Sequence, residues 1–267
     1  MRTMNVHSPV GVFDSGLGGL SVLRELRAQL PEERWLYYAD SAHCPYGERS
    51  PAYILDRCTS IVDALVEREA KVVVVACNTA TSVALAALRA RYGVPIVGMV
   101  PAVKPAAAAT RSGRIGVLAT PRTVTGEALA ALIREHASGT EVSAVPAPGL
   151  VELVEAGQLA GPEVEAALRP VVCPLLARGV DTLVLGCTHY PFLRGALRAL
   201  AGSEVALIDS GEAVARRTRD VLSLHGLLVE TGNGGSVEVL TSGASGHVSD
   251  VASRLLGERA VATHLPV

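Results

Sequence analysis

Two cysteines stand where thiol chemistry is feasible, each directly after a short apolar run. Cys77 follows the run at 72–76 and Cys187 follows the run at 182–186, and polar residues come next in both places. Where a strand passes into a helix, the free amides of the helix start favour the thiolate form of a cysteine. We therefore predict that both cysteines are reactive thiols at strand ends. The alternative is that each is a small buried hydrophobe, the commonest role of a free cysteine.

The segments that would position these thiols alternate between strand and helix patterns, which is typical of parallel α/β sheets. Strands are predicted at 10–13, 35–39, 72–76, 94–100, 114–120, 141–145, 182–186, 205–210 and 236–241. Helices are predicted at 20–30, 52–70, 82–91, 124–137, 162–178, 191–200, 211–225 and 247–256, with a glycine-rich turn at 232–235.

The pattern repeats once along the chain. Ile115 stands in a copy of the strand around Val10 at an offset of 105 residues, and Cys187 lies 110 residues after Cys77. Two features at nearly one offset indicate two halves of like topology. We predict an α/β fold of two similar domains, each a mainly parallel sheet flanked by helices. The second sheet is complete near residue 210, so the tail is expected to rejoin the first, giving domains of 1–98 plus 211–267 and 99–210.

Composition excludes several classes of protein. A net charge of −2 and 3% aromatic residues argue against nucleic-acid partners. No apolar run reaches the roughly 18–20 residues of a membrane span, and the first residues lack an apolar signal core, so a cytoplasmic protein without a membrane partner is expected. Five cysteines without a C-x-x-C pair suggest neither a disulfide framework nor a cysteine-rich zinc site.

The loop DSGLGG at 14–19 follows the first predicted strand and is interpreted as a ligand loop. A dinucleotide site is an alternative, with Asp40 as the ribose-binding acid, but Ser21 stands where the third glycine would be required. A second alternative is that Asp14 only caps the following helix.

His189 lies two residues after Cys187 and allows three interpretations. It could be a packed or capping side chain, a metal ligand together with Cys187, or a proton partner of the thiol. We favour the proton partner, because further ligands at metal spacing are missing. Glu155, considered by itself, fits a solvated helix face.

The motifs GVFDSGLGGLSV, PYG, ACNTAT, GVLATPRTV, GCTHYP and IDSGEAVA occur in this order over nearly the whole chain. In them the sequence resembles the glutamate racemase family of the cofactor-independent aspartate/glutamate racemase superfamily. The resemblance implies two α/β domains with the active site in the cleft between them, glutamate as substrate, a homodimer, and a role in supplying D-glutamate for peptidoglycan. It implies no cofactor and no metal. The nearest rival is an aspartate or other amino-acid racemase, and a rival of another class is a metabolite-binding module.

Residue by residue, the resemblance implies that Cys77 and Cys187 are the two acid/base thiols, that Asp14 assists Cys77, and that His189 and Glu155 assist Cys187. The positions implied to bind substrate are Asp14, Ser15, Tyr46, Gly47, Asn78, Thr79, Thr120, Thr123 and Thr188. The sequence departs from the family pattern at Ala147, where a cysteine is frequent, and at Cys44.

The scarcity of lysine independently favours a reaction without pyridoxal phosphate, which needs a Schiff-base lysine. Lys71 precedes a predicted strand and so lies at the wrong end for the site, and Lys104 is expected in a turn between two prolines.

Overall fold

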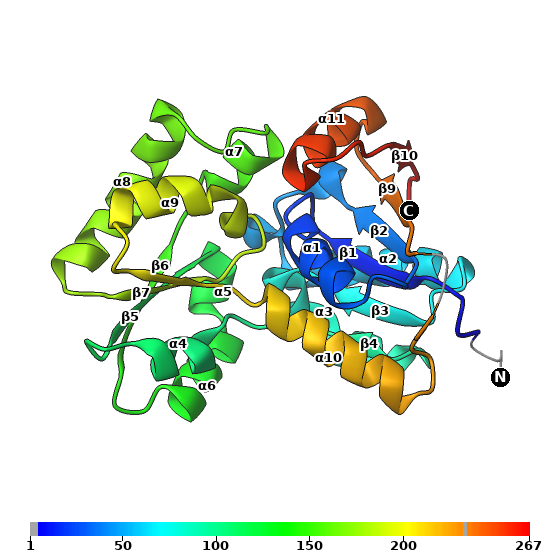
Figure 1. Ribbon diagram of the computed structural model, residues 1–267, viewed down its shortest axis with the longest axis horizontal. Helices are drawn as coiled ribbons and strands as arrows, with labels where there is room; N and C mark the ends of the chain where they lie inside the picture. Colours follow the sequence, from blue (N-terminus) through cyan, green and yellow to red (C-terminus); the bar gives the residue numbers. More distant parts are fainter. Residues whose placement is uncertain (1–4, 232–233) are drawn as a thin grey trace. The chain divides into compact units, whose positions relative to one another are not determined.

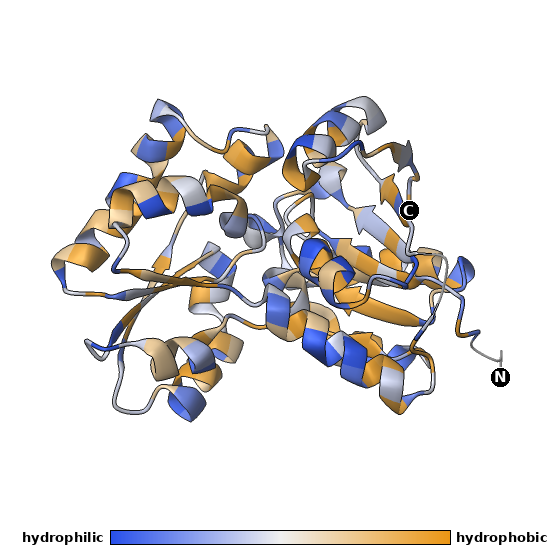
Figure 2. Ribbon diagram, in the orientation of Figure 1, coloured by the Kyte–Doolittle hydropathy of each residue, from blue (hydrophilic) through white to orange (hydrophobic). Residues whose placement is uncertain are grey.

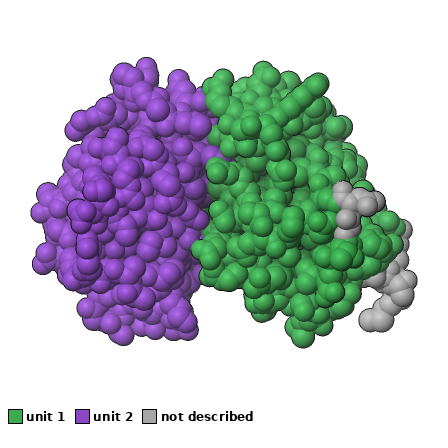
Figure 3. All heavy atoms as spheres, viewed as in Figure 1, with its two compact units in different colours: residues 1–99, 211–267 green, residues 100–210 purple. Residues whose placement is uncertain are grey.

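The computed structural model describes residues 5–231 and 234–267, so the predicted glycine-rich turn lies partly outside the described residues, at 232–233. The chain divides into two compact units, one of residues 1–99 with 211–267 and one of residues 100–210 (Figure 3). Each unit is built around its own parallel sheet.

The first unit contains a six-stranded sheet in the order β10-β9-β2-β1-β3-β4. Its strands are β1 (Val10–Asp14), β2 (Trp35–Ala39), β3 (Val72–Val75), β4 (Ile96–Val97), β9 (Val237–Thr241) and β10 (Ala262–His264). Every residue of β1, β2 and β3 is buried. This burial explains why these strands read as continuous apolar runs, since helices cover both faces of a parallel sheet.

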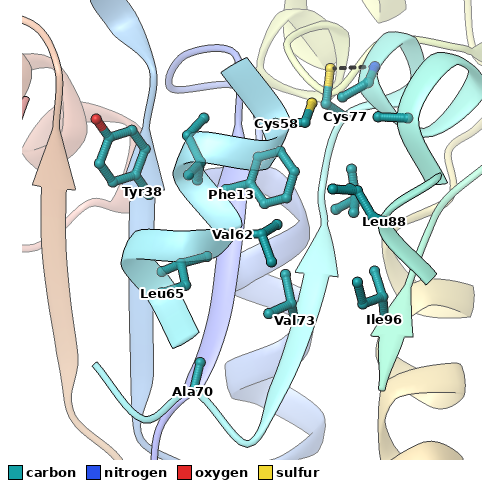
Figure 4. Close-up of a cluster of buried hydrophobic side chains, with 14 of the residues drawn as sticks. Phe13, Tyr38, Cys58, Val62, Leu65, Ala70, Val73, Cys77, Leu88 and Ile96 are labelled. Atoms are coloured by element: carbon teal, nitrogen blue, oxygen red, sulfur yellow. Dashed lines mark hydrogen bonds between the residues drawn. The ribbon is translucent and has the colours of Figure 1, made fainter. Parts of the chain in front are cut away.

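Helices pack on both faces of this sheet (Figure 1). They are α1 (Leu20–Gln29), α2 (Pro51–Glu67), α3 (Asn78–Arg91), α10 (Gly211–Leu224) and α11 (Ser245–Leu256), with short 3-10 turns η1 (Ser41–His43) and η2 (Tyr46–Glu48) between β2 and α2. Helix α1 packs against α10 and α11, and α2 packs against α3. Figure 4 shows the core beneath α2 and α3, where Phe13, Val62 and Leu88 meet.

The second unit contains a four-stranded parallel sheet in the order β6-β5-β7-β8. Its strands are β5 (Arg114–Ala119), β6 (Glu141–Pro146), β7 (Thr182–Leu185) and β8 (Ala206–Ile208). Its helices are α4 (Val103–Ala109), α5 (Pro121–Thr125), α6 (Glu127–His136), α7 (Leu150–Glu155), α8 (Pro162–Ala177) and α9 (Arg194–Ala201), with the 3-10 turn η3 (Tyr190–Leu193). Apolar residues of α4 and α6 pack on β5 and β7 to form its core.

The two sheets share one topology. The order β2-β1-β3-β4 of the first unit matches the order β6-β5-β7-β8 of the second, and all strand pairs among the described residues are parallel. The predicted fold class is thereby confirmed. Strands β9 and β10 extend the first sheet beyond this shared pattern.

Several predicted boundaries were wrong. Helix α3 begins at Asn78 rather than at 82, and β4 retains only two of the seven residues predicted. The predicted helix at 124–137 breaks at Gly126 into α5 and α6, because Gly126 is extended. Lys104 lies in α4 rather than in a turn, since Pro105 is tolerated in the first turn of a helix.

The hydropathy of the helices follows their packing (Figure 2). Helix α10, for example, buries Val214, Thr218 and Val221 and exposes charged residues elsewhere on its surface. Among the described residues, no helix is both long and apolar enough to cross a membrane.

Candidate active site

Cys77 lies where β3 passes into α3 and is the N-cap residue of that helix. Its backbone is extended, and its sulfur accepts a hydrogen bond from the Ala80 amide at 3.4 Å (Figure 4). The side chain is 5% exposed. A sulfur at a helix start is stabilised as the thiolate by the amide and by the helix dipole. Helix α3 therefore begins four residues earlier than predicted because Cys77 itself caps it.

Asp14 and Ser15 reach the same sheet edge, because β1 pairs with β3 in parallel. The Cys77 thiol lies within donor distance of the Ser15 hydroxyl, with Sγ and Oγ 3.9 Å apart. Ser15 Oγ in turn lies 3.4 Å from Oδ1 of Asp14. Hydroxyl and carboxylate thus form a polar path that leads to the sulfur.

Asp14 also closes its own loop, since Oδ2 accepts the Gly19 amide at 2.8 Å. Gly19 and not Asp14 is the N-cap residue of α1, so Asp14 closes the loop before the helix and does not cap it. A Cβ on Gly19 would lie 2.7 Å from the Asp14 Cβ and 2.9 Å from the Tyr37 hydroxyl. Glycine is therefore required here by the close approach of the loop to Asp14 and to β2.

The remaining predicted residues of this unit are buried around the same edge. Asn78 and Thr79 form the first turn of α3, and the Asn78 Oδ1 atom has no hydrogen-bond partner among the described residues. Tyr46 and Gly47 lie in η2, and the Tyr46 hydroxyl donates to Asp40 Oδ2 at 2.5 Å. A buried unpaired amide oxygen is costly without a partner, so Asn78 is suited to a ligand donor such as an ammonium group.

Asp40 does not fit the dinucleotide interpretation. It is fully buried, and both of its carboxylate oxygens accept hydrogen bonds from the Arg57 guanidinium. A carboxylate engaged in this way is not free to bind a ribose hydroxyl.

In the second unit, Cys187 follows β7 and lies beside a histidine–carboxylate pair. The Nδ1 atom of His189 is 3.6 Å from the Cys187 sulfur, and Nε2 is 2.6 Å from Oε1 of Glu155. The histidine is 1% exposed, and the Glu155 side chain is 17% exposed. The carboxylate favours the tautomer of His189 that carries its proton on Nε2, and in that tautomer Nδ1 faces the thiol as a proton acceptor. The local pattern suggested a solvated helix face for Glu155, and this interpretation was wrong, because Glu155 lies at the end of α7 against His189.

Tyr190 packs next to this pair and was not singled out by the sequence. Its hydroxyl donates to the Ala147 carbonyl at 2.9 Å. Burial, with a smaller effect of neighbouring Cys187, raises the pKa of Tyr190 well above its usual value of 10.0, so the phenol stays neutral. Ala147, where the family pattern frequently has a cysteine, thus anchors Tyr190 through its backbone.

The predicted threonines occupy the same sheet edge of the second unit. Thr188 is buried directly after Cys187, and Thr120 follows β5, which pairs with β7. Thr120 is the N-cap of α5, where its Oγ1 accepts the Thr123 amide at 3.4 Å and lies 3.0 Å from the Thr123 hydroxyl. These contacts are those of a helix N-cap.

The other cysteines lie in different surroundings. Cys58 of α2 is fully buried in the apolar core (Figure 4), and burial raises the pKa of its thiol far above the usual value of 9.0. Such a thiol is an inert core side chain. Cys173 in α8 and Cys44 before η2 are partly exposed.

Two parallel sheets, each ending in a buried cysteine with proton-handling side chains around it, define an α/β enzyme suited to proton transfer. Residues 12–218 match the Asp/Glu/hydantoin racemase family, and the chain belongs to that family. It is therefore a racemase, a kind of isomerase.

The relatives carry a narrower name. The chain is 58% identical to the glutamate racemase of Pseudomonas aeruginosa, over 82% of this chain and 83% of that protein. It is 54% identical to the glutamate racemase of Deinococcus radiodurans, over 90% of this chain and 83% of that one.

Solved structures agree with these relatives. A glutamate racemase of Bacillus anthracis superposes with a TM-score of 0.90 at 32% identity and covers 98% of this chain and 99% of its own. The Escherichia coli glutamate racemase in complex with L-glutamate gives a TM-score of 0.85 at 36% identity, with 97% and 98% of the two chains covered.

Proposed function

We propose that the protein interconverts L- and D-glutamate by proton transfer at the α-carbon, with Cys77 and Cys187 as the two bases. The observation that carries the proposal is a buried thiol at the equivalent strand end of each sheet, Cys77 after β3 and Cys187 after β7. Relatives named glutamate racemase at 50–58% identity support glutamate as the substrate.

The chemistry of inversion explains why two thiols are needed. One thiolate removes the α-proton from one face, and the opposite thiol delivers a proton to the other face, so the net charge on the two sulfurs is unchanged. In the reverse direction the roles exchange. An unperturbed cysteine is mostly protonated at neutral pH, so each sulfur needs local help to act as a base. For Cys77 we assign this help to the α3 amides and the Ser15–Asp14 path, and for Cys187 to His189 and Glu155.

We further propose two domains, residues 1–98 plus 211–267 and residues 99–210, each of which supplies substrate-binding residues. Ser15, Asn78, Thr79, Tyr46 and Gly47 would bind it from the first domain. Thr188 would bind it from the second, together with Thr120 and Thr123. A mechanism based on thiols, amides and hydroxyls uses neither a metal nor pyridoxal phosphate. Burial of the site strengthens the hydrogen bonds that stabilise the carbanion.

In the cell this reaction would supply D-glutamate for peptidoglycan synthesis, and we propose a cytoplasmic homodimer as the form that performs it. Light scattering of the purified protein tests the dimer directly.

The test of function uses purified protein, without added pyridoxal phosphate, incubated with each glutamate enantiomer in deuterium oxide. We expect the opposite enantiomer to form with deuterium at the α-carbon. Cys77→Ala and Cys187→Ala should each lower racemisation by about 10²–10⁴-fold, the range for loss of an acid/base group. Cys173→Ala is the matched control and should retain full activity. Full racemisation by either active-site variant would overturn the two-thiol mechanism. Faster turnover of aspartate than of glutamate would overturn glutamate as the substrate.

A further inference from the structure

The segment between β2 and α2 is held from both ends by one face of α2. This segment, residues 40–50, carries Tyr46 and Gly47, which the proposed function places against the substrate. Tyr53 and Arg57 lie one helical turn apart on α2 and so face the same way. The Tyr53 hydroxyl lies 2.5 Å from Nδ1 of His43, and the Arg49 guanidinium lies 5.5 Å from the Tyr53 ring centre.

Arg57 holds the start of the segment through Asp40. Its Nε donates to Asp40 Oδ2 at 3.0 Å and its Nη2 donates to Oδ1 at 2.8 Å, which is a bidentate pair. The same carboxylate accepts the Tyr46 hydroxyl at 2.5 Å and the Ser242 hydroxyl at 2.7 Å. Asp40 is fully buried, so its charge depends on these four donors.

The third nitrogen of Arg57 reaches the C-terminal segment. Nη1 donates to the main-chain oxygen of Val267 at 2.6 Å, and the Tyr38 hydroxyl donates to the Leu265 carbonyl at 2.8 Å. The Arg57 guanidinium therefore joins Asp40, at the start of the segment before α2, to Val267. The Asp40 carboxylate adds Ser242, just after β9, to this network. Burial lowers the pKa of Arg57, but the hydrogen bonds and charge of Asp40 outweigh it and raise that pKa above its usual value. Burial and Asp40 also raise the pKa of Tyr46, so its hydroxyl remains a donor.

We propose that Arg57 is a positioning residue that acts through Asp40 to fix Tyr46 and Gly47, and thereby sets the affinity for the amino-acid substrate. This inference rests on the proposed function. Without the guanidinium, a buried carboxylate loses its counter-charge, and Tyr46 loses a fixed acceptor. The segment then samples other positions, and the free energy of substrate binding becomes less favourable because binding must order it.

The expected signature is a change in KM. Arg57→Met should raise KM for both glutamate enantiomers by about 10-fold or more, with a smaller change in kcat, because loss of uniform binding acts on KM. Arg57→Lys keeps the charge but loses the bidentate geometry and should give an intermediate KM. Arg91→Met is the matched control. This substitution removes another arginine that is paired with a carboxylate, here Asp63 of α2, but the pair is exposed, so KM should stay unchanged.

A double-variant cycle separates positioning from general destabilisation. If Arg57 acts through Tyr46, the KM increase in Arg57→Met/Tyr46→Phe should be smaller than the product of the two single increases. Arg57→Lys and Ser242→Ala remove fewer of the interactions with Asp40, so they allow the test if Arg57→Met does not fold. KM increases are expected in both, and thermal unfolding is recorded for every variant.

The unaltered protein is assayed first. If it does not racemise glutamate, the proposed function fails and this inference fails with it. If it does, wild-type KM values in both Arg57→Lys and Ser242→Ala would overturn the inference alone. The inference would also be overturned if the KM increase in Arg57→Met/Tyr46→Phe equalled the product of the increases in the two single variants.

Discussion

At the level of single residues, the two thiols have different surroundings. Cys77 accepts an amide hydrogen bond from α3 and lies near the Ser15 hydroxyl. Cys187 instead lies beside a histidine that a carboxylate orients. Because L- and D-glutamate are mirror images, their equilibrium constant is one, and kcat/KM must be equal in the two directions. Unequal surroundings of the thiols can therefore appear only in kcat and KM taken separately.

Glu155→Gln tests the part that the carboxylate plays. The amide keeps the shape of the side chain but removes the charge that makes His189 a better proton acceptor. We expect kcat/KM to fall by about 10–100-fold, equally for both enantiomers, with unequal changes in kcat. Circular dichroism of the reaction in both directions measures this. Glu152→Gln alters an exposed carboxylate one turn earlier on α7 and is the control. An unchanged kcat/KM would show that Glu155 does not act on Cys187.

At the level of elements, a carboxylate fixes the turn between α4 and β5. Asp181, just before β7, accepts hydrogen bonds from the Thr110 hydroxyl at 2.6 Å and from the amides of Arg111 and Ser112 at 2.8 and 2.7 Å. Partial burial raises the pKa of Asp181, but these hydrogen bonds outweigh it and hold that pKa well below the usual 3.8. The interaction helps to align β5 with β7, the two strands that lead to Thr120 and Cys187.

Asp181→Asn should lower the free energy of unfolding at pH 7 by about 1–2 kcal/mol, a value reduced for solvent screening at this partly exposed turn. The pKa is lower in the folded than in the unfolded state. The ionised group therefore contributes its full stability above about pH 4, and this contribution is lost as the pH falls further. Urea unfolding at pH 7 and pH 3 should show a smaller difference from the unaltered protein at pH 3. Asp220→Asn, an exposed site on α10, is the control. An equal difference at both pH values would contradict this role of the charge.

At the level of the whole chain, a buried ion pair ties together segments far apart in sequence. Lys71 Nζ lies 2.5 Å from Glu33 Oε2, and it donates to the carbonyls of Val6 at 2.5 Å and Leu227 at 2.9 Å. Glu33 Oε1 accepts the Val229 amide at 2.9 Å. Both side chains are almost fully buried. Burial lowers the pKa of Lys71, and the contact with Glu33 opposes that decrease. Lys71 is therefore a structural lysine of the first unit.

Lys71→Met should destabilise the protein by about 3–5 kcal/mol, because it leaves the Glu33 charge buried without a partner. Lys71→Met/Glu33→Leu should recover much of this loss, since an apolar pair avoids the desolvation cost of both charges. Chemical denaturation measures the difference, with the exposed Lys104→Met as control. Racemisation per folded molecule should be retained. If the double variant is less stable than Lys71→Met, the unpaired Glu33 charge is not the cause of the lost stability.

Much of the fold could be predicted because it depends on local patterns. The apolar runs before Cys77 and Cys187 indicated buried strands, and β3 and β7 are those strands. Boundaries were less predictable where a single residue decides them. Cys77 caps α3 and starts it early, and the extended Gly126 divides α5 from α6. Strand β10 was missed, because its three residues carry no distinct pattern and depend on pairing with β9.

The sequence alone determined the class of fold, the repeat, and the two thiols as candidates. These features depend on hydrophobic periodicity and on small polar residues at strand ends, which residues adjacent in the sequence show directly. The tertiary structure decided which side chains share a proton or a charge. Glu155 meets His189 across 34 residues, and Arg57 meets Asp40 across 17 and Val267 across 210. No local pattern records such pairs, since they form only when parallel strands bring their ends to one edge and helices return over the sheet.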